Sequence, residues 1–455
     1  MKKILFVHAK GGVPLDHAIP RMAAHGELHM LAVAAPPDDA WRGHCAQVIE
    51  AWSANPRGED LVELIVATAK EVGADAVIGF SEYVLLAVSL AAGRLGLPGP
   101  GDTVRLSRDK RLMRERWVQT GVPIPAFRRV GSEADLLAAF HELAPPVLLK
   151  PAWGAGSVGQ RVLHAEADVA PAWQAITGGL AELAGCGLGE YYETGAPRQL
   201  LIEEIIAGSV RGWYDEPGLG DYLSVEGIVA AGEFHPIAIT GRIPTIPPFT
   251  ELSSHAPTAL DETAQRRIEA LAKKAVDALD LDTCGTHTEI KLCQDGTAML
   301  IESAARFGGS AITGVVESVF GVDMVGMLTR QLLGEPVDYP EQMLTTASSA
   351  AAEMSLIGTD AAGRPWQSAP VWDSRTANLA SLVSPGSTIT HVTGMTAPDG
   401  TVVPRYDEAR GITNCIGMLF LTALDRHQML SDIYAVLNGL ERRLVEAMAD
   451  TPGQE

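Results

Sequence analysis

The most informative segment of the chain is THTEIKLCQDGTAMLIESAARFGG, residues 286–309, which places two acidic residues inside apolar strand patterns. Asp295 and Gly296 supply a turn between the two strands, so the segment predicts a β-hairpin. Residues at similar distances from a hairpin turn lie opposite each other, and this rule pairs Glu289 with Glu302. Two facing carboxylates repel unless a cation lies between them, and Mg²⁺ prefers carboxylates completed by water and phosphate oxygens. The hairpin is therefore predicted to hold a divalent cation.

Charged neighbours of this hairpin leave a second interpretation open. Lys291 or Arg306 could neutralise one of the two carboxylates as a structural ion pair. Arg306 also opens the sequence RFGGSAIT, whose glycines permit close approach of a ligand. A guanidinium there could grip a carboxylate or a phosphoryl group with two parallel hydrogen bonds.

Two lysines precede the hairpin in a context that suggests phosphate binding. Lys150 ends the apolar strand pattern PPVLLKPA, residues 145–152, and a lysine is costly to bury without an anionic partner. Lys150 is therefore predicted to point toward a phosphate. Lys110 lies in SRDKRLM on a charged helix, where a lysine is usually solvated, and its place upstream of Lys150 is what makes it a candidate.

The loop after Lys150 spells GxGxxG at residues 154–159, a pattern that also occurs in dinucleotide-binding folds. That fold requires a helix directly after the glycines, but the continuation QRVLHA has a strand pattern. A hairpin whose glycine loop folds over phosphates fits better, because glycine lets backbone N–H groups approach an anion closely. A plain surface loop is the remaining alternative.

The rest of the chain predicts a mixed α/β and α+β protein. Residues 1–101 alternate strands at 2–9, 29–35 and 74–80 with helices and end at GLPGPG, which indicates a small parallel α/β domain. A charged helix is predicted over 102–121 and others near 314–333 and 426–448. We expect one antiparallel sheet, interrupted by a helix over 261–279, with strands at 200–206, 221–232, 232–243, 286–293 and 296–306.

Composition limits the classes of function. With 35 basic against 56 acidic residues the formal net charge is −21, so nucleic acid is not expected as a partner. The 5 cysteines form no CxxC pair, which favours a reducing compartment. Because no uninterrupted apolar run reaches about 18 residues, we expect a cytoplasmic protein without a membrane partner.

The chain resembles the ATP-grasp superfamily in the order and spacing of its candidate residues. These are Lys110, Lys150 with the glycine loop, Glu203 in LIEEIIAG, Glu289 with Glu302, and Arg306. The resemblance implies an ATP-grasp fold over residues 102–335, with subdomains at about 115–200 and 201–335, a Rossmann-like domain at 1–101 and a C-terminal α+β lobe at 336–455. It implies that ATP and Mg²⁺, or Mn²⁺, are cofactors, with the metal on the two hairpin glutamates. The remaining ATP contacts would come from Lys110, Lys150, Gly154, Gly156, Ser157, Glu203, Glu204 and Ile206.

Within that superfamily the segments at 221–244, 249–262 and 286–309 look like those of the L-amino acid ligases. This likeness implies that a carboxylate is activated as an acyl phosphate and joined to an amine, forming a dipeptide, ADP and phosphate, as in antibiotic biosynthesis. Arg306 and Lys150 would then be catalytic. The substrate residues would be Glu251, His255, Arg306, Gly309 and Ser310. Amino acids and ATP are the expected partners, and a homodimer is a reasonable expectation.

Two other functions remain open. One keeps the same chemistry with a non-amino-acid acceptor, as in a purine-biosynthetic ligase or a carboxylase. The other is a regulatory protein that binds a nucleotide without spending it, although such a protein has no need of both metal carboxylates.

Overall fold

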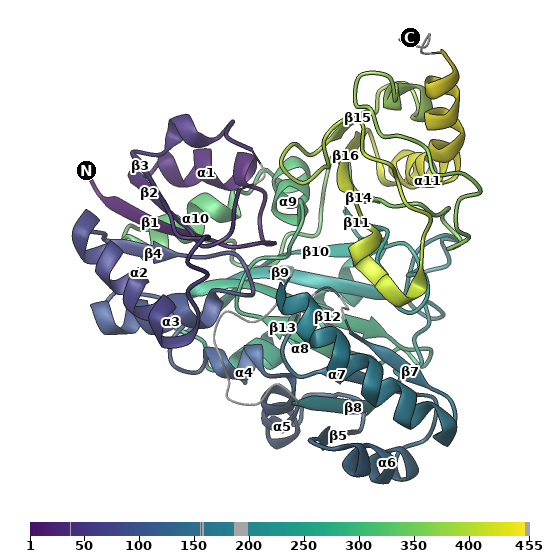
Figure 1. Cartoon of the computed structure of the whole chain (residues 1–455), viewed down its shortest axis with the longest axis horizontal. Coiled ribbons are helices and arrows are strands. Elements are labelled where there is room, and N and C mark those ends of the chain that lie inside the picture. The colour runs from purple at the N-terminus through teal and green to yellow at the C-terminus, as the bar shows by residue number, and fades with distance from the viewer. Residues whose placement is uncertain (37, 155, 157–158, 186–198, 451–455) are drawn as a thin grey trace.

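A computed structural model describes residues 1–36, 38–154, 156, 159–185 and 199–450 (Figure 1). The N-terminal region is a parallel sheet of order β3-β2-β1-β4, as the alternating pattern predicts. Its apolar strands pack against α2 and α3 on one face and α1 on the other. The elements are β1 (Lys3–His8), α1 (Leu15–Ala23), β2 (Glu27–Ala32), η1 (Arg42–His44), β3 (Gln47–Glu50), α2 (Gly58–Val72), β4 (Ala76–Ile78) and α3 (Leu85–Leu95).

The charged helix predicted over 102–121 is in fact two helices, α4 (Val104–Arg108) and α5 (Lys110–Thr120). Asp109 adopts an extended conformation between them, and its carboxylate accepts a hydrogen bond from the backbone N–H of Arg111. This is the N-cap arrangement that acidic residues favour, so a new helix begins at Lys110. The backbone N–H of Lys110 also donates to the carbonyl of Ala152 at 3.0 Å, which ties the start of α5 to the loop that follows Lys150.

A small antiparallel sheet of order β5-β8-β6-β7 follows. The strand over 200–206 belongs to this sheet, so the prediction of a single antiparallel sheet is wrong at that strand. Strand alternation identifies a strand but not its partner. Helices α6 and α7 cover one face through residues such as Leu136 and Ile176. The elements are β5 (Phe127–Val130), α6 (Glu133–Glu142), β6 (Val147–Pro151), β7 (Arg161–Leu163), η2 (Glu166–Asp168), α7 (Val169–Gly185) and β8 (Leu200–Glu204).

A large antiparallel sheet of order β13-β12-β9-β10-β11-β14-β16-β15 forms the centre of the molecule. Helix α8 packs against the part nearest β13, and α11 packs against the C-terminal part (Figure 1). Its strands are β9 (Tyr222–Ala230), β10 (Glu233–Arg242), β11 (Ser253–Ala256), β12 (Cys284–Leu292), β13 (Ala298–Ala304), β14 (Ala350–Leu356), β15 (Thr388–His391) and β16 (Gly417–Ala423). The C-terminal strands β14, β15 and β16 belong to this same sheet. The sheet therefore does not mark a boundary at residue 335, and the domain limits of 102–335 and 336–455 stay a prediction.

The helix predicted over 314–333 is interrupted at Gly321, which has a φ of 71° and ends α9 as a left-handed cap. The helices beside the central sheet are α8 (Glu262–Asp277), α9 (Ile312–Phe320), α10 (Met324–Leu332), η3 (Leu379–Leu382), η4 (Glu408–Asn414) and α11 (Arg426–Asp450). Among the described residues, no single helix has both the length and the apolar character of a membrane span. The pair α9 and α10 passes that test only jointly, with a bend of 104°.

Candidate active site

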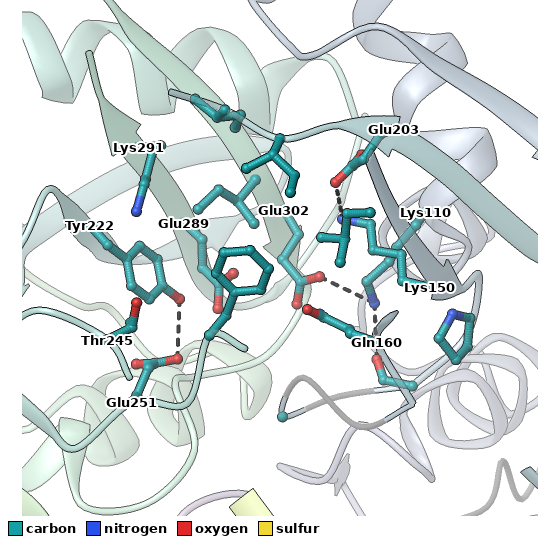
Figure 2. A pocket seen from close by; sticks show the side chains of 18 of the residues that line it. Lys110, Lys150, Gln160, Glu203, Tyr222, Thr245, Glu251, Glu289, Lys291 and Glu302 are labelled. Atoms are coloured by element: carbon teal, nitrogen blue, oxygen red, sulfur yellow. Dashed lines mark hydrogen bonds and ion pairs between the residues drawn. The ribbon is translucent and has the colours of Figure 1, made fainter. Parts of the chain in front are cut away.

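The predicted hairpin is β12 and β13, and its register sets Glu289 directly opposite Glu302. Both side chains extend from adjacent strands into a pocket between the small and central sheets (Figure 2). They are partly buried, with side-chain exposures of 16% for Glu289 and 19% for Glu302. The structure thus confirms the facing pair that the sequence predicts.

Lys110 stands between this pair and the glycine loop. Its Nζ lies 3.1 Å from Glu302 Oε2 and donates to the carbonyl of Gly154 at 3.0 Å. Burial alone would raise the pKa of Glu302, but Lys110 and Lys150 lower it to about 2. Glu302 is therefore ionised at neutral pH and able to bind a cation. The ion pairs considered for Lys291 and Arg306 involve other partners, since Lys291 pairs with Asp221 and Arg306 with Glu82.

Lys150 has the anionic partner that a buried lysine needs, and that partner is Glu203 on the neighbouring strand β8. Lys150 is 2% exposed, and burial lowers its pKa while Glu203 opposes that shift. The Glu203 carboxylate also accepts from Arg114 Nε at 3.1 Å. The Glu203 side chain therefore serves two buried cations, which sequence reasoning did not foresee.

The segment after Glu203 lines the same pocket through Glu204, Ile205 and Ile206. It joins the small sheet to the central one, the position expected for the wall against an adenine ring. Gly154 and Gly156 also line the pocket, while Ser157 lies outside the described residues. Gly154 has a φ of 137°, a conformation that side chains rarely adopt. Strand β7 follows the loop, which excludes the helix that a dinucleotide-binding motif requires.

Arg306 follows β13 but does not line this pocket. Its Nε lies 2.5 Å from Glu82 Oε2, and Glu82 also pairs with the buried Arg108. Glu82 follows β4, so it comes from the carboxyl edge of the N-terminal parallel sheet. Burial would raise the pKa of Glu82, but Arg108 and Arg306 hold it below its ordinary value. Sequence reasoning missed Glu82, whose signal is an acidic residue at the carboxyl end of a parallel strand.

The remaining predicted substrate residues divide into two groups. Glu251 lines the pocket and pairs with the buried Arg242 at 2.6 Å. His255 is 1% exposed and packs against the backbone of Gly241, and burial together with Arg242 lowers its pKa to about 3. His255 and the segment Gly309–Ser310 do not line the pocket, so their expected place among the substrate residues lacks support from this geometry.

Other residues in and beside the site were also missed. Tyr222 and Gln160 line the pocket (Figure 2), and His287 lies next to Glu289 on the same face of β12. Burial would lower the pKa of His287, but the carboxylates of Glu226 and Glu289 raise it to about 10. The sequence did contain a signal for His287, because it lies two residues before Glu289 and residues two apart in a strand point to the same face.

The donor set fits a divalent cation shared with a phosphate ligand. The part of the chain that the structure describes contains no group of three or more His, Cys, Asp or Glu side chains arranged to hold a metal. A cage made only of protein side chains is therefore not found there. Two facing carboxylates with open space beside them match Mg²⁺, which keeps waters and completes its octahedron with phosphate oxygens.

Comparison with known proteins agrees with this fold. Residues 143–314 match the family model of the ATP-grasp domain. The L-amino acid ligase from Bacillus licheniformis superposes with a TM-score of 0.72 at 17% identity, covering 96% of this chain and 97% of that one. A biotin carboxylase from Campylobacter jejuni superposes with a TM-score of 0.66 at 16% identity, over 97% and 95% of the two chains. Residues 143–314 therefore match an ATP-grasp domain, and the chain has the ATP-grasp fold.

Among curated proteins the chain is similar to the alanine–anticapsin ligase (bacilysin synthetase) of Bacillus subtilis strain 168. The two are 37% identical over 292 residues, which is 64% of this chain and 61% of the relative. An L-arginine-specific L-amino acid ligase of Bacillus subtilis is 22% identical over 252 residues, 55% of each chain. The matched region thus spans about three fifths of the length of the first relative, and the likeness to the L-amino acid ligases expected from the sequence is confirmed.

Proposed function

We propose that this chain is an ATP- and Mg²⁺-dependent ligase that joins two L-amino acids into a dipeptide and releases ADP and phosphate. The observation that carries the proposal is the direct pairing of Glu289 with Glu302 in the pocket that Lys110 and Lys150 also line. The similarity to the alanine–anticapsin ligase supports amino acids as substrates.

The two lysines would bind the phosphates. Lys110 reaches both Glu302 and the glycine loop, so it lies where a triphosphate beside the carboxylate pair would need a positive charge. Lys150 is held by Glu203 and has little freedom to move, which suits a fixed positive charge rather than a mobile one. Glu204–Ile206 would border the adenine ring, with Gly154, Gly156 and Ser157 over the phosphates.

Glu289 and Glu302 would hold Mg²⁺ or Mn²⁺, which when bound supplies charge neutralisation and orientation for the phosphoryl group. A free carboxylate resists attack by an amine because its leaving group would be oxide. Transfer of the terminal phosphoryl group to a carboxylate oxygen gives an acyl phosphate, and attack by an amine then expels phosphate as the amide forms. The rate acceleration in this chemistry comes mostly from positioning of the reactants and from charges held in fixed places.

Arg306 would stabilise charge on the acyl phosphate or grip a substrate carboxylate. Its guanidinium is buried beside Glu82 and within electrostatic reach of both Glu289 and Glu302. The same region includes Gly309 and Ser310, which we propose border the substrate, while Glu251 provides a carboxylate inside the pocket for a substrate amino group. We also propose a cytoplasmic homodimer with no nucleic-acid or membrane partner.

Two alternative functions share part of this chemistry. A ligase or carboxylase with a non-amino-acid acceptor is favoured by the fold shared with biotin carboxylase. A protein that binds nucleotide without turnover would have no use for both carboxylates.

The test is a screen of amino acid pairs with ATP and Mg²⁺, following ADP by coupled assay and new peptides by mass spectrometry. The proposal expects a dipeptide and equimolar ADP for at least one pair. Nucleotide binding with no ADP formation from any amino acid, or ADP formation only with bicarbonate or ammonia, would overturn it.

A further inference from the structure

We propose that His287 and Glu226 are positioning residues that hold the Glu289 carboxylate in its cation-binding orientation. The inference rests on the proposed function, because it assigns to Glu289 the role of a metal ligand. Neither residue lines the pocket.

The sheet register brings the three side chains together. Glu226 on β9 is paired with His287 on β12, and Glu289 lies two residues further along the same strand. Residues two apart in a strand point to the same face. The ring of His287 is thereby placed between a carboxylate on its own strand and a carboxylate on the next one.

The ring of His287 approaches a carboxylate through each of its nitrogens. Nδ1 lies 2.9 Å from Glu226 Oε1 and 3.0 Å from Glu226 Oε2, and Nε2 lies 3.4 Å from Glu289 Oε1. Because carboxylate oxygens only accept hydrogen bonds, Nδ1 donates to Glu226, whereas Nε2 faces Glu289 at an ion-pair distance. The rigid ring therefore lies between the two carboxylates, with Nδ1 on Glu226 and Nε2 toward Glu289 Oε1.

Glu226 is itself held in place. It is 1% exposed, and its Oε1 accepts from Ser224 Oγ at 2.8 Å and from Thr240 Oγ1 at 3.0 Å. The buried Arg242 donates to the same Ser224 hydroxyl at 3.0 Å. A carboxylate anchored by this many partners cannot follow His287 if the ring moves, so it acts as a fixed point for the ring.

The backbone closes the remaining side of His287. A Cβ atom added to Gly308 would lie 2.9 Å from His287 Nδ1, closer than real Cβ contacts. The RFGG segment after β13 is therefore packed tightly against the ring, and His287 is only 5% exposed. The ring has no room to turn away from Glu289.

Two substitutions of His287 test the roles of its two ring nitrogens separately. Asparagine can place an amide near the Nδ1 position, so His287→Asn keeps a donor for Glu226 but loses the reach to Glu289. Glutamine can place its amide near Nε2, so His287→Gln keeps a donor for Glu289. The probe is Mn²⁺ in the presence of the non-hydrolysable analogue β,γ-imido-ATP, with bound Mn²⁺ measured by electron paramagnetic resonance.

We expect His287→Asn to weaken Mn²⁺ binding by about 10-fold or more, the range seen when a residue supporting a metal ligand is removed. His287→Gln should lose less, and binding of the analogue without metal should stay unchanged. If His287→Asn does not fold, Glu226→Gln takes its place and should weaken Mn²⁺ binding in the same direction. His141→Asn is the matched control, because His141 also lies 3.4 Å from a glutamate, Glu166, but on the surface.

Native Mn²⁺ affinity in folded His287→Asn, or an equal loss in the Asn and Gln variants, would overturn the inference. These results are distinct from failure of the proposed function. If the native protein makes dipeptides while His287→Asn binds Mn²⁺ normally, only the positioning role is wrong. If the order of Mn²⁺ affinities holds but no amino acid pair yields ADP, the ligase assignment is wrong and the positioning role stands.

Discussion

Glu82 accepts a hydrogen bond from Arg306, so the edge of the N-terminal parallel sheet is tied directly to the end of β13. The two residues are far apart in sequence, and the second partner of Glu82 is Arg108 at the end of α4. This carboxylate compensates two buried guanidinium groups. The N-terminal region therefore fixes the orientation of the arginine that we propose acts on the acyl phosphate.

Glu82→Gln should lower the rate of dipeptide formation by about 10- to 100-fold, the value of one or two hydrogen bonds to a charged group. The affinity for β,γ-imido-ATP should stay unchanged, since Glu82 does not line the nucleotide pocket. Steady-state kinetics and calorimetric titration measure the two quantities. Glu59→Gln, at an exposed pair with Arg94, is the control. Equal losses of turnover and of nucleotide affinity would show that Glu82 does not act through Arg306.

Lys150 and Glu203 should be coupled in stability. Glu203→Gln leaves Lys150 and Arg114 without their shared buried counter-charge, and this should lower the free energy of unfolding by about 3–5 kcal/mol. Adding Lys150→Met should restore part of that loss, because one of the uncompensated charges is then removed. Urea denaturation of the two single variants and the double variant provides the measurement. Strictly additive losses would contradict the coupling.

Glu353 should make stability depend on pH. Its carboxylate lies in β14 and accepts from Ser254 Oγ at 2.8 Å and from the backbone N–H of Ala311 at 2.6 Å. Burial raises its pKa from 4.5 to about 7. At Glu353 the folded protein therefore binds more protons than the unfolded chain between these values, so the contribution of this residue to stability is greatest below pH 4.5 and falls as the pH rises toward 7.

Glu353→Gln removes this titration while keeping a group that can accept from Ala311. The variant should gain stability relative to the native protein as the pH rises across that window, by at most about 3 kcal/mol. Thermal or urea unfolding of both proteins at several pH values measures the difference. A difference that stays constant over the window would show that Glu353 does not titrate there.

The local parts of this site could be predicted from sequence. The turn at Asp295–Gly296 and the alternation on either side bring Glu289 close to Glu302, while their direct pairing also depends on a register shift between Glu289 and Ile290 that the pattern does not show. The strand pattern directly after the glycine loop excluded a dinucleotide-binding motif, and this signal too lies in residues that are close together in the sequence. The start of the chain was predicted equally well, since an alternation of strands and helices leads to a parallel sheet.

The long-range parts could not be predicted. Lys150 contacts Glu203 because β6 and β8 are neighbours in the small sheet. The residue pattern of either strand does not identify the strand with which it pairs. Glu82 reaches Arg306 across two separate sheets. The burial of His255 depends on β11 lying between β10 and β14, a strand order that becomes visible only in three dimensions.

The most direct test of the paired carboxylates is amino-acid-dependent ADP release by Glu302→Ala, measured beside the native protein with ATP and Mg²⁺. Glu335→Ala, at a surface pair with Arg330, serves as the control and should keep native turnover. Loss of one of two metal carboxylates should reduce the rate at least about 100-fold while the fold persists. Turnover by Glu302→Ala within about twofold of the native rate would contradict the metal site and the mechanism built on it.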